Sequence, residues 1–234
     1  MSEHYIGNEL ELFDKAKNWK RYYGNIIKPL LTGDVMEVGA GIGATTRSLC
    51  NGSQKKWICL EPDAALASQI IAMQQKKELP ECCELRIGTL ADQNQSELFD
   101  AVIYIDVIEH IENDAAELQR AKNHLKPGGH LIILVPAHQW LYSPFDEAIG
   151  HFRRYNKFML NKAIPSGMKK HKLIYLDSIG LMASVANKLF LKQSYPTQKQ
   201  VLFWDSTLVP LSRLMDVITF NAIGKSLLGI WKKS

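Results

Sequence analysis

A glycine-rich turn is the feature of this 234-residue sequence that points most directly to ligand binding. It satisfies the spacing G-x-G-x-x-G/A and reads Gly39-Ala40-Gly41-Ile42-Gly43-Ala44. Glycines in such a turn let the backbone bend tightly and approach a ligand closely at a helix N-terminus. Glu61 follows at the end of the next apolar run, where a carboxylate can accept both hydroxyls of an adenosine ribose. Nicotinamide cofactors and S-adenosylmethionine both carry that adenosine, so these residues alone favour neither.

Glu37 separates the two cofactors, because it lies inside an apolar run two residues before Gly39. A carboxylate buried there costs several kcal/mol unless a neighbour pairs with it. It would repel a pyrophosphate, whereas it is compatible with the ammonium-bearing methionine end of S-adenosylmethionine and can accept backbone hydrogens of the glycine loop. The alternative is a purely structural cap on the loop, which suits the same ligand.

Histidine, arginine and tyrosine side chains gather in a segment predicted to be a long loop, residues 138–155. If the ligand is S-adenosylmethionine, transfer of its methyl group to a hydroxyl or ammonium would need a general base near neutrality, and histidine suits that role. We predict His151 as the base or a donor to the acceptor, with a loop-anchoring role equally favoured, and His138 as its competitor. The remaining candidates for acceptor contact are Tyr142, Arg153, Arg154, Tyr155 and His110.

Arg153 and Arg154 could clamp an anionic group, since guanidinium forks match carboxylate or phosphate. The alternative is that one of them pairs with Asp146 or Glu147 to brace the loop.

Apolar runs alternating with helical segments predict a parallel sheet. The expected strands are residues 35–40, 57–62, 84–88, 99–105, 130–135, 173–176 and 224–233, with helices from residue 45, over 64–76 and 113–124, and from 156. A turn is predicted at residues 126–129, and a mostly helical insertion at residues 179–220. We expect one domain, 1–234, made of an N-terminal helical cap (1–34), a cofactor-binding core (35–136), a substrate loop with the insertion (137–223) and a last strand (224–234).

Composition is that of a globular protein, with 46% hydrophobic and 22% charged residues. The net charge of +4 is modest, so nucleic-acid binding is not expected. The polar, acidic N-terminus predicts a cytoplasmic protein without a transmembrane segment. The four cysteines lack zinc-ligand spacing and are interpreted as apolar fillers; no metal site is predicted.

The run Glu37-Val38-Gly39-Ala40-Gly41-Ile42-Gly43 resembles the E/D-x-G-x-G-x-G motif of class I S-adenosylmethionine-dependent methyltransferases. Residues 99–111 resemble that family's fourth strand and following loop, and residues 125–129 the turn before its fifth strand. The segments Pro136-Ala137-His138, Tyr142, Asp146 and Gly150-His151-Phe152-Arg153-Arg154-Tyr155 resemble a bacterial subgroup associated with glycan, lipid or secondary-metabolite modification.

This resemblance implies a doubly wound, Rossmann-like sheet of seven mostly parallel strands, with an antiparallel last strand after the helical insertion. The implied cofactor is S-adenosyl-L-methionine, bound by Glu37, Gly39, Ala40, Gly41, Gly43, Glu61, Pro62, Thr89, Leu90, Asp106 and Val107. Thr89 departs from the acidic residue of many relatives, and Asp92 is its substitute for reading the adenine edge. The implied activity is methyl transfer to an O or N atom of a small-molecule, glycan or lipid-linked acceptor in a biosynthetic reaction.

Two rival functions share these features, namely a nicotinamide-dependent oxidoreductase and a cofactor-binding partner protein without catalysis. The insertion adds a peripheral membrane contact as a further hypothesis. Its apolar residues Leu181, Phe190, Leu202, Phe203 and Trp204 lie near Lys188, Lys192 and Lys199. The sequence does not predict an oligomeric state.

Overall fold

The computed structural model describes residues 9–191 and 195–234, in which seven strands form one sheet. The strands are β1 (Asp34–Val38), β2 (Lys56–Glu61), β3 (Cys83–Ile87), β4 (Phe99–Ile105), β5 (Leu125–Pro136), β6 (Met168–Leu176) and β7 (Ser226–Lys233). Their order across the sheet is β3-β2-β1-β4-β5-β7-β6. The pairs from β3 to β5 are parallel, whereas β7 runs antiparallel to both β5 and β6. The predicted fold class is confirmed, including the antiparallel last strand.

Both faces of the central strands are apolar, because helices cover the sheet from both sides. In β1, Val35 belongs to one buried cluster and Met36 to the other. Neighbouring strands alternate in the same way, with Trp57 on the first face and Ile58 on the second. This two-sided burial explains why the strands read as continuous apolar runs.

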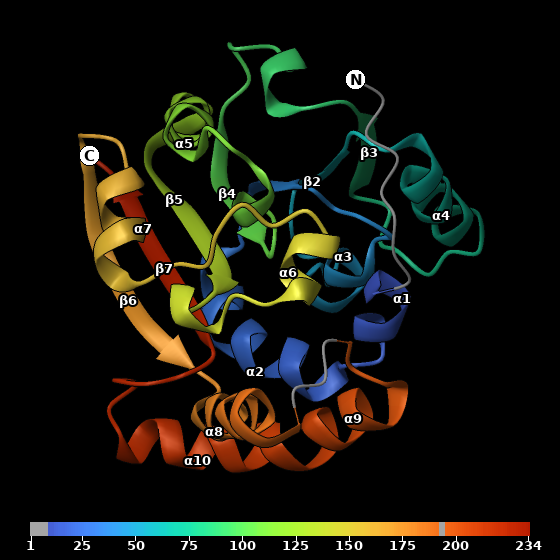
Figure 1. The fold of residues 1–234 in the computed structure, drawn as a ribbon. Helices are drawn as coiled ribbons and strands as arrows, with labels where there is room; N and C mark the ends of the chain where they lie inside the picture. The colour runs from blue at the N-terminus through green and yellow to red at the C-terminus, as the bar shows by residue number, and fades with distance from the viewer. Residues whose placement is uncertain (1–8, 192–194) are drawn as a thin grey trace.

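Helices α2, α3, α4 and α10 contribute to the first cluster, and α5 and α7 to the second. The bounds are α1 (Glu9–Asp14), α2 (Lys17–Ile27), α3 (Ala44–Leu49), α4 (Ala64–Gln75), α5 (Asp114–Asn123), α6 (Pro144–Ala148), α7 (Lys157–Ala163), α8 (Ser178–Ala186), α9 (Gln198–Phe203) and α10 (Val209–Ile218). Two π-helical turns, Asn187–Leu191 and Trp204–Leu208, continue α8 and link α9 to α10. Together α8, α9 and α10 form the helical insertion, a layer at the bottom of the view in Figure 1.

Three local predictions differ from the structure. The expected turn at residues 126–129 lies within β5, where the register shifts opposite Phe99 and Gly128 has a φ of 78°. This bulge lets the strand pair continue past the glycines. Strand β6 begins earlier than expected because β7 pairs with it from Met168 onward. The segment after β5 contains α6, whose start is capped by Asp146 accepting from the Ser143 amide and hydroxyl.

Within the described residues, no helix is both long and apolar enough to cross a membrane.

Candidate active site

A cavity of about 250 Å³ lies at the carboxyl ends of β1 and β4. The strand order reverses between these two strands, and ligands of open α/β sheets bind at such a crevice. The lining comprises Leu10, Phe13, Asp14, Trp19, Lys20, Tyr23, Gly39, Ala40, Gly41, Ile42, Ala44, Thr45, Ile105, Asp106, Glu109, His110, Pro136, Phe145, Ile149, His151, Trp204, Lys225 and Ser226. The glycine loop therefore meets residues of the loops after β4 and β5 in one hollow.

The glycine loop depends on backbone conformations that favour glycine. Gly39, Gly41 and Gly43 have φ values of 70°, 57° and 80°. A Cβ atom on Gly39 would lie 2.6 Å from Val107 Cγ2, so only glycine lets the loop pack against that side chain. Gly43 lies outside the cavity and serves as the N-cap of α3. The loop thus presents Gly39 to Gly41 to a ligand and uses Gly43 to start the helix.

Glu37 is buried beneath this loop rather than in the cavity. Its Oε2 accepts the Thr46 hydroxyl at 2.6 Å and the Trp57 indole N–H at 2.9 Å. Burial raises the pKa of Glu37 to about 7, opposed by these two hydrogen bonds. The partners it was expected to need are thus side chains of α3 and β2.

Glu61 joins the end of β2 to the glycine loop. Its Oε2 accepts the Gly41 amide at 2.7 Å, and its Oε1 accepts the Asp63 amide at 2.9 Å. Burial raises its pKa, against the effect of both hydrogen bonds. Pro62 beside it is exposed, and neither residue lines the cavity.

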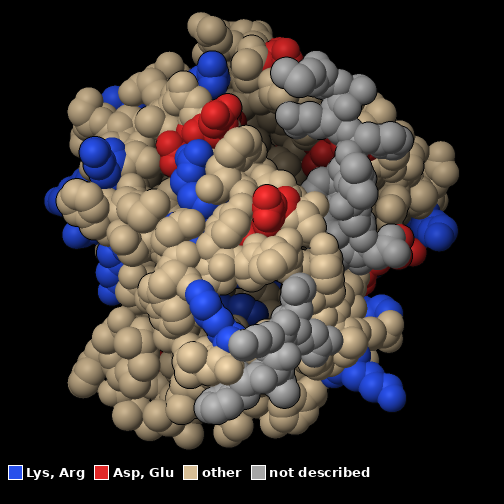
Figure 2. All heavy atoms as spheres, in the orientation of Figure 1, with Lys and Arg blue, Asp and Glu red and all other residues tan. Residues whose placement is uncertain are grey.

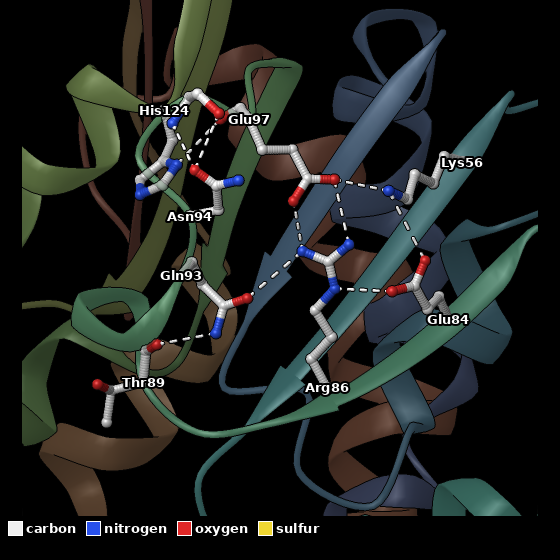
Figure 3. A network of polar contacts seen from close by, with 9 residues as sticks. Lys56, Glu84, Arg86, Thr89, Gln93, Asn94, Glu97 and His124 are labelled. Atoms are coloured by element: carbon white, nitrogen blue, oxygen red, sulfur yellow. Dashed lines mark hydrogen bonds and ion pairs between the residues drawn. The ribbon is translucent and has the colours of Figure 1, made fainter.

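Thr89 and Leu90 follow β3 and also lie outside the cavity. The Thr89 amide and hydroxyl both donate to Asp92 Oδ2, so Asp92 caps the turn that begins at Thr89. Figure 3 shows how the next part of this loop is held, since the Glu97 carboxylate contacts both Lys56 and Arg86. The loop that carries Thr89 is thereby fixed against β2 and β3.

Asp106 directly follows β4, has a φ of 54° in the left-handed backbone region, and lines the cavity together with Gly39. A residue other than glycine in this conformation is strained, and such strain is common at functional sites. Desolvation raises the pKa of Asp106 to about 6, opposed by the neighbouring His151 and by the Lys20 ammonium.

Glu109 is a cavity residue that sequence reasoning missed. Its side chain is fully buried, and neither carboxyl oxygen has a hydrogen-bond partner among the described residues. The nearest basic atom is His151 Nε2, 3.8 Å from Oε1. Burial raises the pKa of Glu109 well above its usual range. The signal in the sequence was a carboxylate between Ile108 and His110. The sequence does not show that this carboxyl lacks a hydrogen-bond partner.

His151 reaches the cavity from the loop after α6 and is held by Asp146. Its Nδ1 lies 2.9 Å from Asp146 Oδ1. Asp146 is fully buried and also accepts two hydrogen bonds from Arg154, at 2.8 and 2.9 Å. Burial raises the pKa of Asp146, but the hydrogen bonds from His151 and Arg154 outweigh it and hold that pKa well below the usual range. A carboxylate only accepts, so Nδ1 donates to Asp146, and Nε2 is the ring nitrogen on the side of Glu109.

His110 lies edge-on to His151, with ring centroids 4.5 Å apart. Burial and the neighbouring His151 lower its pKa to about 4, so the ring is neutral near pH 7.

Two groups of side chains could each offer three ligand atoms to a metal ion, all within 4.8 Å of one another. One is Glu109, His110 and His151, and the other is Cys50, Cys82 and Cys83. The three thiols come together although Cys50 is distant in sequence from Cys82 and Cys83.

The other predicted acceptor residues have partners within the protein. Arg153 pairs with Asp114 at 3.0 Å, and the Tyr155 hydroxyl donates to the same carboxylate. The Tyr142 hydroxyl donates to the His151 carbonyl. These side chains, like Arg154, lie outside the cavity lining and brace the loop.

His138 lies outside the cavity as well. Its Nε2 is 2.9 Å from the Gly224 carbonyl, and its ring stacks on Tyr175.

Two lysines that the sequence did not single out reach the cavity from distant parts of the chain. The Lys20 ammonium donates to the Phe13 carbonyl at 2.6 Å, and Lys225 Nζ lies over the Trp204 ring, 5.4 Å from its centroid. Burial lowers the pKa of both. The cavity therefore combines carboxylates on the β4 side with amines from the helical cap and the start of β7.

Residues 36–131 match the family model of a methyltransferase domain. The ubiquinone biosynthesis O-methyltransferase of Idiomarina loihiensis is 29% identical over 98 residues, which span 42% of this chain and 40% of that relative. An S-adenosylmethionine-dependent methyltransferase from Clostridium acetobutylicum has a similar structure, with a TM-score of 0.62 and 12% identity, covering 97% of this chain and 98% of that one. The N-methyltransferase NodS from Bradyrhizobium japonicum, in complex with S-adenosyl-l-homocysteine, also has a similar structure, with a TM-score of 0.56 and 12% identity. The match covers 92% of this chain and 86% of NodS.

The sheet order and the cavity at its switch point define the class I methyltransferase fold. The matched segment begins in β1 and ends in β5, and thus includes the glycine loop, Asp106 and Glu109. The chain accordingly has the fold of these methyltransferases, and its residues 36–131 match a methyltransferase domain. The left-handed conformations of Gly39 and Gly41, which both line the cavity, let the backbone come close to a ligand there.

Proposed function

We propose that this protein transfers the methyl group of S-adenosyl-L-methionine to an O or N atom of a small-molecule, glycan or lipid-linked acceptor. The observation that carries the proposal is the pairing of Asp146 with Nδ1 of His151, a residue that lines the cavity. In the proposed reaction the other ring nitrogen, Nε2, accepts the proton of the acceptor. The same cavity is lined by the glycine loop. A proton acceptor and a cofactor loop in one hollow suit methylation of a group that must lose a proton.

The bound cofactor supplies an electrophilic methyl group on a sulfonium, and the chain's own residues hold and orient both partners. In this proposal Gly39, Ala40 and Gly41 contact the cofactor through their backbone, and Gly43 and Val107 shape the loop. Glu61 accepts ribose hydroxyls, with Pro62, Thr89 and Leu90 bordering the adenine. Glu37 supports the loop from below, and Asp106 lies beside the methionine ammonium.

Glu109 extends this assignment to the acceptor. A buried carboxyl without a hydrogen-bond partner is costly, so a ligand donor at that position would relieve the cost. In this assignment Glu109 and His110 contact the hydrogen-bond donor group of the acceptor. His151 accepts the proton that this group loses. Holding the acceptor atom in line with the methyl group supplies most of the acceleration.

Arg153 and Arg154 have Asp114 and Asp146 as partners, so the proposal does not require an anionic acceptor. Arg154, Tyr142 and Tyr155 act as positioning residues for the loop. His138 has no role in the proposed reaction.

Calorimetric titration tests the cofactor half of the proposal. S-adenosylmethionine and S-adenosylhomocysteine should bind the wild type and bind Glu61→Ala more weakly, while nicotinamide dinucleotides should not bind. Binding of only a nicotinamide cofactor would overturn the proposal in favour of the oxidoreductase.

A panel of phenols, sugar alcohols and amines, with S-adenosylhomocysteine formation as the readout, tests the acceptor half. For the acceptor that reacts, His151→Ala should lower kcat by about 100-fold or more. The matched control His171→Ala, which changes an exposed histidine on β6, should keep full activity. Equal loss in both variants would remove the assigned role of His151.

A further inference from the structure

The outward face of α10 is apolar, although it lies at the surface. Exposed side chains here and in the turn that follows are Leu211, Leu214, Val217, Ile218, Phe220 and Ile223, which we call the α10 face. Leu214 is 64% exposed and Val217 is 69% exposed. Apolar surface of this extent on a folded protein marks an interaction site.

Two of the buried residues on the inward side of the same helix are polar, Ser212 and Asp216, beside the apolar Val209. Asp216 is fully buried and accepts hydrogen bonds from the Tyr22 hydroxyl and the amides of Asp177 and Ser178. Ser212, one turn earlier, donates to Asp177 Oδ1 at 2.7 Å. These bonds fix the rotation of α10, so its leucines cannot turn inward to escape water.

Phe220 extends the α10 face as an aromatic side chain that is 89% exposed. It has a φ of 52°, and the turn is held by the Asn221 amide, which donates to the Asp216 carbonyl at 2.7 Å. A bulky residue in the left-handed region is unfavourable. The turn therefore holds an aromatic ring outward at the end of a row of aliphatic side chains.

The exposed charges of the helical insertion have one sign. Residues 178–223 contain two carboxylates, Asp205 and Asp216, and both are buried. The exposed charged side chains in the described part of this range are Lys188, Lys199 and Arg213. Figure 2 shows the lower part of the molecule, over α8 and α10, as a mostly tan surface with almost no red.

We propose that the α10 face docks on a membrane containing anionic phospholipids. Apolar side chains on an element whose exposed charges are cationic are the combination that enters the headgroup region of such a bilayer. Helix α10 packs on α2, whose Trp19 and Tyr23 line the cavity, so docking brings the cavity close to the lipid. The inference goes beyond the methyl transfer proposed above and does not rest on it.

Vesicle flotation of the full chain tests the proposal. The wild type should float with vesicles of phosphatidylcholine and phosphatidylglycerol at about 3:1, and less with phosphatidylcholine alone or at high salt. The double variant Leu214→Ser/Val217→Ser should partition at least about tenfold less. Phe158→Ser is the matched control, since this side chain on α7 is 75% exposed and lies outside the α10 face; it should bind like the wild type.

Thermal unfolding and calorimetric binding of S-adenosylhomocysteine report whether each variant is folded. A folded wild type that does not float, or a folded double variant that still floats, overturns the proposal. So does a stable dimer in analytical ultracentrifugation that the double variant abolishes, because a second copy would then cover this face. Lys188→Gln/Lys199→Gln should lose the preference for anionic vesicles; an unchanged preference would contradict the charge argument.

Discussion

Replacing Glu109 should stabilise the ligand-free protein while impairing its proposed activity. The side chain is fully buried and both carboxyl oxygens lack hydrogen-bond partners among the described residues. Each unpaired buried polar group costs about 1–3 kcal/mol. Leucine has a similar size and no polar atoms, so Glu109→Leu should raise the free energy of unfolding by about 2 kcal/mol. At 2–4 °C per kcal/mol, Tm should rise by roughly 4–8 °C.

The effect should depend on pH in a defined direction. Burial raises the pKa of Glu109, so the folded protein retains a proton that the unfolded chain releases. Stability of the wild type is therefore lost as pH rises above the ordinary carboxyl pKa towards the raised one. Glu109→Leu lacks this loss, and its advantage over the wild type should grow as pH rises above the ordinary carboxyl pKa.

Glu97 provides a control in which stability should depend on pH in the opposite direction. Its carboxylate contacts Arg86 and Lys56 in the network of Figure 3, and the hydrogen bond from Arg86 lowers its pKa to about 2. Glu97→Gln should reduce the free energy of unfolding by about 1 kcal/mol. This loss should be complete above the ordinary carboxyl pKa and should fade as pH falls towards 2.

Urea unfolding followed by circular dichroism at several pH values measures both variants, and S-adenosylhomocysteine formation measures turnover. We expect Glu109→Leu to be more stable and less active than the wild type. A Glu109→Leu protein that is less stable at every pH would show that the carboxyl has a stabilising partner, and its assignment to the acceptor would lose its basis.

Three further predictions concern the site. Gly39→Ala should weaken S-adenosylhomocysteine binding in calorimetry by about tenfold or more, because its Cβ would meet Val107 at 2.6 Å in a left-handed conformation; unchanged affinity would show that the loop can shift. Asp146→Ala should lower the free energy of unfolding in urea by about 3–5 kcal/mol, because it leaves the buried Arg154 without its partner; a loss below about 1 kcal/mol would mean that water replaces the carboxylate. Glu37→Gln should flatten the pH dependence of stability between 4.5 and about 7, the interval in which the wild type loses stability as pH rises; an unaltered pH profile would exclude the raised pKa.

The sequence by itself determined which segments along the chain form strands and helices, and where the glycine turn lies. Strands buried on both faces must be apolar throughout, and glycines are needed where φ is positive, so both leave local marks in the chain. The strand at Phe99–Ile105 is placed as predicted, and Gly39, Gly41 and Gly43 take the left-handed conformations that their spacing suggested. Glu37 could be singled out for the same reason, since a lone carboxylate in an apolar strand must find a partner.

Tertiary structure alone decided which side chains are left free to meet a ligand. Arg153 and Arg154 look like an anion clamp in sequence, but Asp114 and Asp146 take both guanidinium groups. Glu109 looks ordinary, yet the fold buries it without a hydrogen-bond partner among the described residues. The α10 face stays exposed because Asp216, on the other side of the helix, accepts a hydrogen bond from Tyr22, 194 positions away in the chain. Such pairings join residues far apart in sequence, and local composition carries no record of them.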